Sequence, residues 1–402
     1  MKTKLISIGV VVLVLALLFT LAPSCGKEKG EAKTLKIGVI LPYTGPAAPW
    51  ANQIDQGLEW VKDKINAAGG IKVGADTYMI ELVKCDDKIT GSVAAECATK
   101  MVYDEKVHYV VGPILTAPAT NPILTEGKCF SAIIAVSSAH ELGPQYPYTW
   151  CTLPDIPGWV DAFFKQAFDL HPEIKTVGLV GTTSGLGLEY LEANRAAAEH
   201  YGRGVVHEAT FEIGIVDFYP VLTPLVAKNP DAISLCGGPG VGDQALMVKQ
   251  ARELGYKGLF IGANHGTEDT LVNVAGVEYA EGFMTNAPVY TSEVYPEVVH
   301  QLYAEFQQRY AGAPFELTQY LAYGAVMAYK QAIERAGIID PDEVLKVFDD
   351  PTWKFEWFGM PGRSLGGLNT FGIRRANQDE NCLSVVRNGK REAVSCMRWV
   401  IP

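Results

Sequence analysis

Short apolar runs alternate with amphipathic stretches along most of the chain. In Gln53–Ala68, the residues Ile54, Leu58, Val61 and Ile65 recur at intervals of four, three and four positions, which places them on one face of a helix. Similar stretches predict helices at Gly91–Tyr103, Pro157–Leu170, Leu186–Tyr201, Tyr219–Lys228, Asp243–Leu254 and Glu316–Gly337. Apolar runs of strand length lie between them, at Leu35–Leu41, Met79–Lys84, His108–Gly112, Ala132–Val136, Thr176–Gly181, Val205–Phe211, Ala232–Cys236 and Leu259–Gly262.

This alternation of strands and helices is typical of parallel sheets built from βαβ units. Two such series are present, one before about Thr152 and one after it. We therefore predict an α/β fold with more than one sheet. Sheets of this kind bind ligands at the carboxyl ends of their strands, so the segments that follow the strands are the places to look for a site.

Trp50 lies in such a segment. The stretch TGPAAPWANQIDQGLEWVKDKINAAGG begins where the first strand ends, and it places this large aromatic residue just before a helix. Two interpretations stay open at this point. The side chain either packs against the edge of the core or contacts a ligand at the carboxyl ends of the strands.

The N-terminus has the pattern of an export signal. Lys2 and Lys4 precede an uninterrupted apolar run up to Leu21, and small residues then lead to Cys25. The pattern resembles the bacterial lipobox, in which the cysteine is lipidated; an uncleaved membrane anchor is the alternative. Either interpretation predicts an extracytoplasmic protein attached to a membrane. Residues 1–24 would be the signal peptide, and residues 25–33 a polar tether.

Composition and charge exclude several classes of function. The chain has 402 residues, enough for two domains, and a formal net charge of −11, which argues against binding to nucleic acid or to an anionic membrane surface. The seven histidines are scattered and form no metal-binding motif. The sequence contains no nucleophile elbow, no His-Glu-x-x-His motif and no phosphate-binding loop, so we predict no enzyme activity, no cofactor and no metal.

The cysteines predict one disulfide. Cys382 and Cys396 lie symmetrically about Gly389 in CLSVVRNGKREAVSC, and Asn388-Gly389 is a strong hairpin turn signal. A three-residue loop would place the two cysteines directly opposite each other. Seven cysteines follow Cys25, so at least one thiol is left free, and the pairing of the other five stays open.

Several stretches resemble type I periplasmic binding proteins of the leucine/isoleucine/valine-binding group, the solute-binding components of ABC importers. They are IGVILPYTGPAAPWANQIDQGLEWVKDKINAAGGI, VVGPILTAPATNPI, IVDFYPVLTPLVAKNPDAI and QARELGYKGLFIG. The stretches occur in the order that the family has, and the resemblance extends from Leu35 to about Gly337.

The resemblance implies two lobes, each a parallel sheet flanked by helices, joined by three hinge crossings. We expect the crossings near Tyr148–Pro154, Gly282–Pro288 and Gly359–Ile373. The first lobe would then comprise residues 34–150 and 285–360, the second lobe residues 151–284, and residues 361–402 the third crossing and a C-terminal hairpin. In this family a ligand between the lobes favours their closure, and the permease recognises the closed form.

The resemblance also implies ligand-binding positions in the first lobe. Thr116 takes the place of a hydroxyl that meets the ligand's carboxylate, and a helix N-cap is its alternative role. Val136 offers backbone groups, while Ser137 and Ser138 supply hydroxyls or serve as turn residues. Trp50 aligns with an aromatic residue that lines the cleft, and Tyr43 is a weaker candidate on the same loop.

In the second lobe the sequence departs from the amino-acid binders. Leu186 and Pro239 stand where relatives have tyrosines, and Asn264, with His265 beside it, stands where an acidic residue meets the ligand's ammonium group. A desolvated ammonium group without an anionic partner is costly. The ligand is therefore an amino acid held in another way, or a carboxylate or amide without the amino group. Asp243 and Glu268 are nearby acidic residues that we expect to cap helices.

These observations predict a lipid-anchored solute-binding protein with two partners, a small amino acid or related carboxylate or amide, and an ABC permease. The alternative is a lipid-tethered sensor of the same fold that presents its ligand to a receptor. An enzyme is the third possibility, and the missing motifs argue against it.

Overall fold

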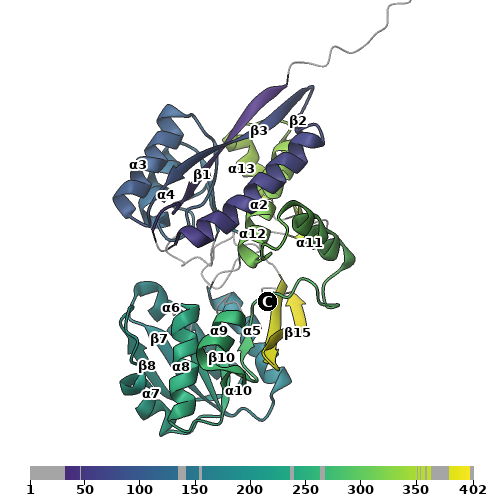
Figure 1. The fold of residues 1–402 in the computed structure, drawn as a ribbon. Coiled ribbons are helices and arrows are strands. Elements are labelled where there is room, and N and C mark those ends of the chain that lie inside the picture. Colours follow the sequence, from purple (N-terminus) through teal and green to yellow (C-terminus); the bar gives the residue numbers. More distant parts are fainter. Residues whose placement is uncertain are drawn as a thin grey trace, which may run out of the picture.

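The protein has two α/β lobes, one above the other in Figure 1. The computed structural model describes residues 32–45, 47–134, 142–153, 156–235, 240–262, 268–350, 352–353, 355–357, 360–363 and 380–398. Each lobe is built around one sheet, and the two sheets confirm the predicted α/β architecture with mostly parallel strands.

The first sheet has the strand order β2-β3-β1-β4-β5-β6. Its strands are β1 (Lys33–Leu41), β2 (Ile71–Val73), β3 (Asp76–Asp86), β4 (Tyr109–Val111), β5 (Phe130–Ile133) and β6 (Thr149–Cys151). All neighbouring pairs are parallel except β2 with β3. The carboxyl ends of β1 and β3 to β6 therefore lie at the same edge of the sheet.

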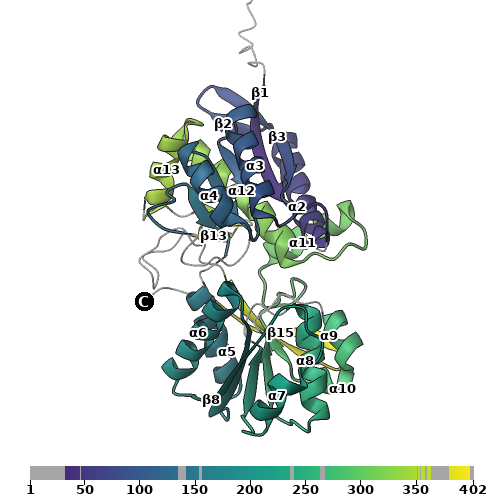
Figure 2. The same cartoon turned by 90° about the vertical axis from the view of Figure 1, so that its left-hand side faces the viewer.

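Helices cover both faces of the first sheet (Figures 1 and 2). They are α2 (Ala48–Ala67), α3 (Gly91–Thr99), α4 (Ala117–Glu126), α11 (Glu297–Arg309), α12 (Leu317–Ala336) and α13 (Pro341–Asp349). The helix predicted at Gly91–Tyr103 is α3 followed by a π-helical turn, η2 (Lys100–Asp104). Helix α12 packs against α2 so closely that a Cβ on Gly57 would lie 2.6 Å from the carbonyl oxygen of Gln319. A short ribbon of β12 (Phe355–Trp357) and β13 (Met360–Arg363) lies beside α12.

The second sheet has the order β15-β14-β11-β10-β9-β7-β8. Its strands are β7 (Thr176–Thr182), β8 (Gly204–Phe211), β9 (Ala232–Leu235), β10 (Leu259–Gly262), β11 (Met284–Thr285), β14 (Glu380–Arg387) and β15 (Lys390–Arg398). Strands β7 to β11 pair in parallel, and the C-terminal hairpin of β14 and β15 is added antiparallel to β11.

Helices also cover both faces of the second sheet. In Figure 2, α5 (Ile156–Leu170) and α6 (Gly185–His200) lie on one side of the strands. The other side carries α7 (Tyr219–Val226), α8 (Val241–Glu253), α9 (Glu268–Ala275) and α10 (Val277–Ala280). Phe218 and Phe260 are fully buried beneath this second set, in a core cluster of its own.

The chain passes from the first lobe to the second between β6 and α5, and returns between β11 and α11. These passages lie at the first two crossings expected from the sequence. Most of the third, Gly359–Ile373, lies outside the described residues, so the number of crossings stays a prediction.

The C-terminal hairpin has a two-residue turn, not the three-residue loop that we expected. Arg387 pairs with Lys390, and Asn388 and Gly389 between them have φ angles of 51° and 74°, as a type I′ turn requires. A register shift after Leu383 then adds one residue to β15, so that Cys382 still lies opposite Cys396. The two sulfur atoms form a disulfide, with the Cα atoms 4.0 Å apart.

Candidate functional site

The carboxyl ends of β1, β3 and β4 and the beginnings of α2, α3 and α4 meet at one edge of the first lobe. Figure 1 shows that β1 runs toward the second lobe and that α2 begins on the side facing it. Parallel strands followed by helices bring helix N-termini to such an edge, where the N–H groups favour negatively charged or polar groups. The ligand-binding residues predicted for the first lobe, among them Trp50 and Thr116, belong to the segments at this edge.

Trp50 lies in the first turn of α2, and 51% of its surface is exposed. Helix α2 packs into the core of the lobe through other residues, such as Leu58 and Val61, which are fully buried. The exposure argues against the core-packing interpretation of Trp50. A half-exposed indole at the edge facing the other lobe is available to cover an apolar ligand surface.

Thr116 lies directly before α4, and its side chain does not cap the helix. The hydroxyl donates instead to a carboxylate oxygen of Asp87, with 2.7 Å between the two oxygens. Both residues are buried, with 6% and 1% of their surfaces exposed. In this arrangement the Thr116 proton is already engaged, and only the oxygen lone pairs are left for a further partner.

Asp87 was not among the candidates taken from the sequence. It follows β3 directly, its N–H donates to Leu41 at the end of β1, and its second carboxylate oxygen accepts the N–H of Ile89 at 3.1 Å. Lys88 and Ile89 both have positive φ angles, which is unusual for a β-branched residue such as Ile89. The signal that would have pointed to Asp87 is its place directly after a predicted strand at the ligand-binding edge.

Tyr43, the weaker candidate, is half-buried and donates its hydroxyl proton to Asp55 on α2 at 3.0 Å. Burial and the nearby Asp55 carboxylate raise the pKa of the Tyr43 hydroxyl well above its ordinary value. Asp55 also pairs with Lys84 on β3, 2.8 Å away. These contacts give Tyr43 a role in fixing the loop to α2.

In the second lobe, Leu186 lies in the first turn of α6, partly buried against the core. Ser184 caps this helix by accepting the N–H of Gly187 at 3.1 Å. Asp243 lies in the first turn of α8 and accepts the N–H of Gly240 at 3.1 Å, the capping role expected for it. Of Glu268 the structure shows only that it begins α9.

The remaining predicted positions lie outside the described residues. They are Cys25, Val136, Ser137, Ser138, Pro239, Asn264 and His265. The strands that lead to them are described and end at Ile133, Leu235 and Gly262. Their roles, like those of Trp50, Thr116 and Leu186, stay predictions.

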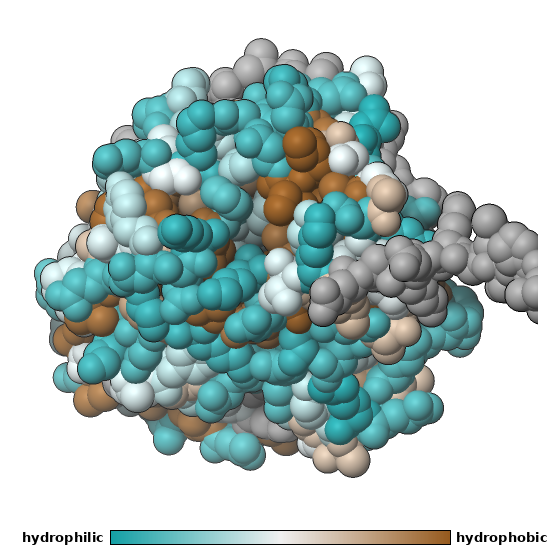
Figure 3. All heavy atoms as spheres, turned by 90° about the horizontal axis from the view of Figure 1, so that it is seen from above, coloured by the Kyte–Doolittle hydropathy of each residue, from teal (hydrophilic) through white to brown (hydrophobic). Residues whose placement is uncertain are grey.

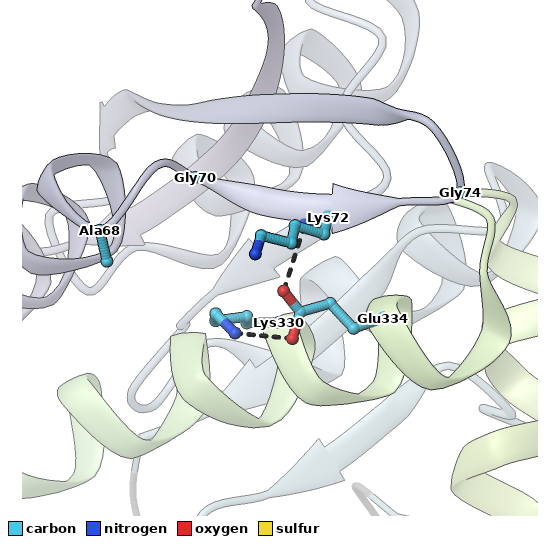
Figure 4. Close-up of a pocket in the computed structure, with 6 residues that line it drawn as sticks. All are labelled: Ala68, Gly70, Lys72, Gly74, Lys330 and Glu334. Carbon is cyan, nitrogen blue, oxygen red and sulfur yellow. Dashed lines mark hydrogen bonds and ion pairs between the residues drawn. The ribbon is translucent and has the colours of Figure 1, made fainter. Parts of the chain in front are cut away.

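A separate pocket lies at the opposite end of the first lobe. Figure 4 shows it between β2 and α12, with Ala68, Gly70, Lys72, Gly74, Lys330 and Glu334 around it. The Glu334 carboxylate accepts hydrogen bonds from Lys330 Nζ at 2.6 Å and from the backbone N–H of Lys72 at 3.1 Å. Both of its oxygens are thus engaged, and the pocket is distant from the candidate edge. The view onto this end of the molecule is mostly hydrophilic, with hydrophobic side chains in small groups (Figure 3).

Four further cysteines lie in the described part of the chain, all of them in the first lobe. Cys85 on β3 and Cys97 on α3 form a second disulfide, Cys129 is a buried free thiol, and Cys151 is buried at the end of β6. Burial raises the pKa of the Cys129 thiol.

Within the described ranges no three His, Cys, Asp or Glu residues are grouped as a metal site. No helix in these ranges has the length and apolar character to cross a membrane.

Comparison with known proteins gives the family. A model of the family described as "Periplasmic binding protein" matches residues 34–390. The Leu/Ile/Val-binding protein homolog 3 of Brucella melitensis is 27% identical over 79% of this chain and 84% of its own length. The structure of a leucine-binding protein, LivK, from Thermotoga maritima superposes with a TM-score of 0.74 at 21% identity, covering 91% of this chain and 99% of that one. A solute-binding protein of an ABC transporter from R. palustris, solved with benzoate, superposes with a TM-score of 0.71 at 19% identity, covering 92% and 98%.

Fold and family together define a protein that binds a solute and carries out no chemistry on it. The chain belongs to the periplasmic binding protein family, as its sequence motifs predicted.

Proposed function

We propose that the protein is the solute-binding component of an ABC importer and captures a small carboxylate-bearing ligand between its lobes. The observation that carries the proposal is the family match over residues 34–390, which spans both sheets and the two described crossings. Closure of the lobes around a ligand would be a population shift, because only the closed arrangement lets the ligand touch both lobes.

The ligand class follows from what the similar proteins share. Leucine and benzoate, named for two of them, differ in the amino group but have in common a carboxylate attached to an apolar body. In this chain the exposed Trp50 would cover the apolar body, and the helix N-termini beside Thr116 would face the carboxylate. Asn264, in place of the acid that meets an ammonium group, favours a ligand without one.

Thermal unfolding against a panel of compounds tests the ligand class. The panel should contain leucine, isoleucine, valine, polar amino acids, short-chain and aromatic carboxylates, and amides. The protein is first unfolded and refolded to remove any bound ligand. A specific ligand at 100 times its Kd stabilises the folded protein by about 2.7 kcal/mol. Stabilisation by carboxylates that lack the amino group supports both parts of our assignment. Stabilisation by branched-chain amino acids would support the carboxylate but contradict the absence of an ammonium group, and stabilisation only by amides would contradict the carboxylate.

We further propose that the lipidated Cys25 attaches the protein to a membrane outside the cytoplasm. Incorporation of labelled palmitate into the protein, and its loss in the Cys25→Ala variant, would support this anchor. Release of Cys25→Ala into the soluble extracytoplasmic fraction is the expected companion result. Membrane retention of the variant without label would instead indicate an uncleaved signal segment.

The sensor of the same fold remains the second candidate function. Deletion of the gene followed by uptake of the identified ligand separates the two. Loss of uptake supports the transport role, whereas normal uptake with a lost cellular response to the ligand supports the sensor.

A further inference from the structure

Asn286 lies at the second crossing, directly after β11, where the chain leaves the second lobe for the first. Its neighbour Thr285 pairs with Gly262, the last residue of β10, on one side and with Ser384 of β14 on the other. Asn286 therefore stands at the carboxyl edge of the second sheet. The segment that follows β10 contains two of the proposed ligand-binding positions, Asn264 and His265.

The side chain of Asn286 is buried and has no hydrogen-bond partner in the part of the chain that the structure describes. Only 5% of the residue is exposed, and neither Oδ1 nor Nδ2 has a partner among the described residues. A carboxamide has two donor hydrogens and an acceptor oxygen, and burying them unsatisfied is strongly destabilising. Native proteins satisfy nearly all such groups, so an unpaired buried carboxamide requires an explanation.

The backbone around Asn286 is held firmly by both of its neighbours. The carbonyl oxygen of Ala287 accepts a hydrogen bond from the buried hydroxyl of Ser384 at 2.7 Å, which ties the crossing to the C-terminal hairpin. Four residues after Asn286, the ring of Tyr290 stacks on Tyr320 of α12 in the first lobe, with the centroids 5.2 Å apart. At this crossing, Ala287 is thus held to the second lobe and Tyr290 to the first, so a rotation of one lobe on the other would change the backbone between them.

We propose that Asn286 is a ligand-linked positioning residue: its carboxamide is unsatisfied in the arrangement of the lobes seen here and acquires partners in the ligand-bound arrangement. The inference rests on the proposed function, since it requires a ligand that changes the relation of the lobes. The unsatisfied amide raises the free energy of the present arrangement of the lobes. The hydrogen bonds that Asn286 forms in the ligand-bound arrangement lower the free energy of that arrangement. Ligand affinity then includes a contribution from a residue on the crossing itself.

The Asn286→Leu variant tests the proposal, because leucine has a similar branched shape and no polar atoms. Thr125→Val is the matched control. The buried Thr125 hydroxyl oxygen also has no partner among the described residues, but Thr125 lies near the end of α4, away from the crossings. Three quantities are measured on the full-length protein: the unfolding temperature without ligand, hydrogen exchange of the peptide that spans residues 283–291, and the Kd for L-leucine and for benzoate by calorimetry.

We expect Asn286→Leu to raise the unfolding temperature without ligand, to slow exchange in residues 283–291, and to weaken binding of whichever compound binds by at least tenfold. The control should raise the unfolding temperature while leaving exchange at the crossing and the Kd unchanged. An Asn286→Leu variant with unchanged exchange at the crossing, or with an unchanged Kd, overturns the proposal. If neither compound binds the unsubstituted protein, the Kd comparison uses the compound that stabilises it in the panel, and an unchanged Kd for that compound overturns the proposal just the same.

Discussion

The hydroxyl of Thr116 donates to the carboxylate of Asp87, and this buried hydrogen bond joins the end of β3 to the beginning of α4. The two residues are 29 positions apart in the sequence. Their contact fixes two of the three loops at the edge where the sequence and the fold place the ligand.

Replacing Thr116 with valine should destabilise the protein by about 1–3 kcal/mol, because the buried Asp87 carboxylate loses a donor and gains none. Thr116→Ser is the control, since it retains the hydroxyl and removes only a methyl group. Urea unfolding of the three proteins measures the difference. Equal stability of Thr116→Val and the unsubstituted protein would mean that Asp87 finds another donor.

Substitution of Trp50 by alanine should weaken ligand binding about tenfold, or about 1.4 kcal/mol, and change the free energy of unfolding by less than about 0.5 kcal/mol. The side chain is half exposed, so its loss opens no core cavity but removes apolar surface that the ligand would cover. Tyr103→Ala is the control, because that aromatic side chain is 52% exposed on η2, outside the candidate edge. Calorimetric titration with the ligand found in the panel gives the Kd values, and an unchanged Kd for Trp50→Ala would assign it a packing role.

The periodicity of apolar residues predicted most strands of the two sheets and many of their helices, but not the helices α11 and α13 or the strands β2 and β6. A helix that is buried on one side has apolar residues at every third or fourth position. Helix α2 follows this spacing at Ile54, Leu58, Val61 and Ile65, and all four are buried. Short or two-residue strands such as β11 carry no such pattern. They form because neighbouring strands are already in place, which a local sequence pattern does not record.

The candidate site was less predictable for the same reason. Trp50 could be placed at the edge from its position after a strand, but the partner of Thr116 could not, because Asp87 and Thr116 meet only through the order of strands in the sheet. The hairpin shows a similar limit. Its turn was visible in Asn388-Gly389, whereas the register shift that brings Cys382 opposite Cys396 depends on the packing of β15.

Asp231 should make stability depend on pH in the acid range. Its carboxylate accepts the backbone N–H groups of Lys175 and Thr176 at 2.9 and 2.8 Å, and the first of these bonds is the main reason that its pKa is lowered. A carboxyl group with a lower pKa in the folded state stabilises the protein above its unfolded pKa of about 4, and this contribution is lost as the pH falls through the lowered value.

Asp231→Asn should therefore be less stable than the unsubstituted protein at pH 7, by about 1 kcal/mol because the group is largely exposed, and the difference should shrink toward pH 3. Asp104→Asn, which removes an exposed carboxylate from the first lobe, controls for the change in net charge. Urea unfolding at several pH values gives the comparison. A difference that stays constant between pH 7 and pH 3 would contradict the assignment.

Removing the Cys382–Cys396 disulfide by a double substitution to alanine should lower the free energy of unfolding by about 3 kcal/mol, because the bond closes a loop of about 15 residues in the unfolded chain. The matched control is the double alanine variant of Cys85 and Cys97, whose sequence separation of 12 predicts a similar loss. The two variants should differ in ligand binding. The hairpin holds the second crossing through the bond from Ser384 to Ala287, so only the hairpin variant should alter the relation of the lobes and weaken binding. Unfolding by urea and calorimetric titration measure the two effects, and equal Kd values for both variants would show that the hairpin stabilises the second lobe without influencing the crossing.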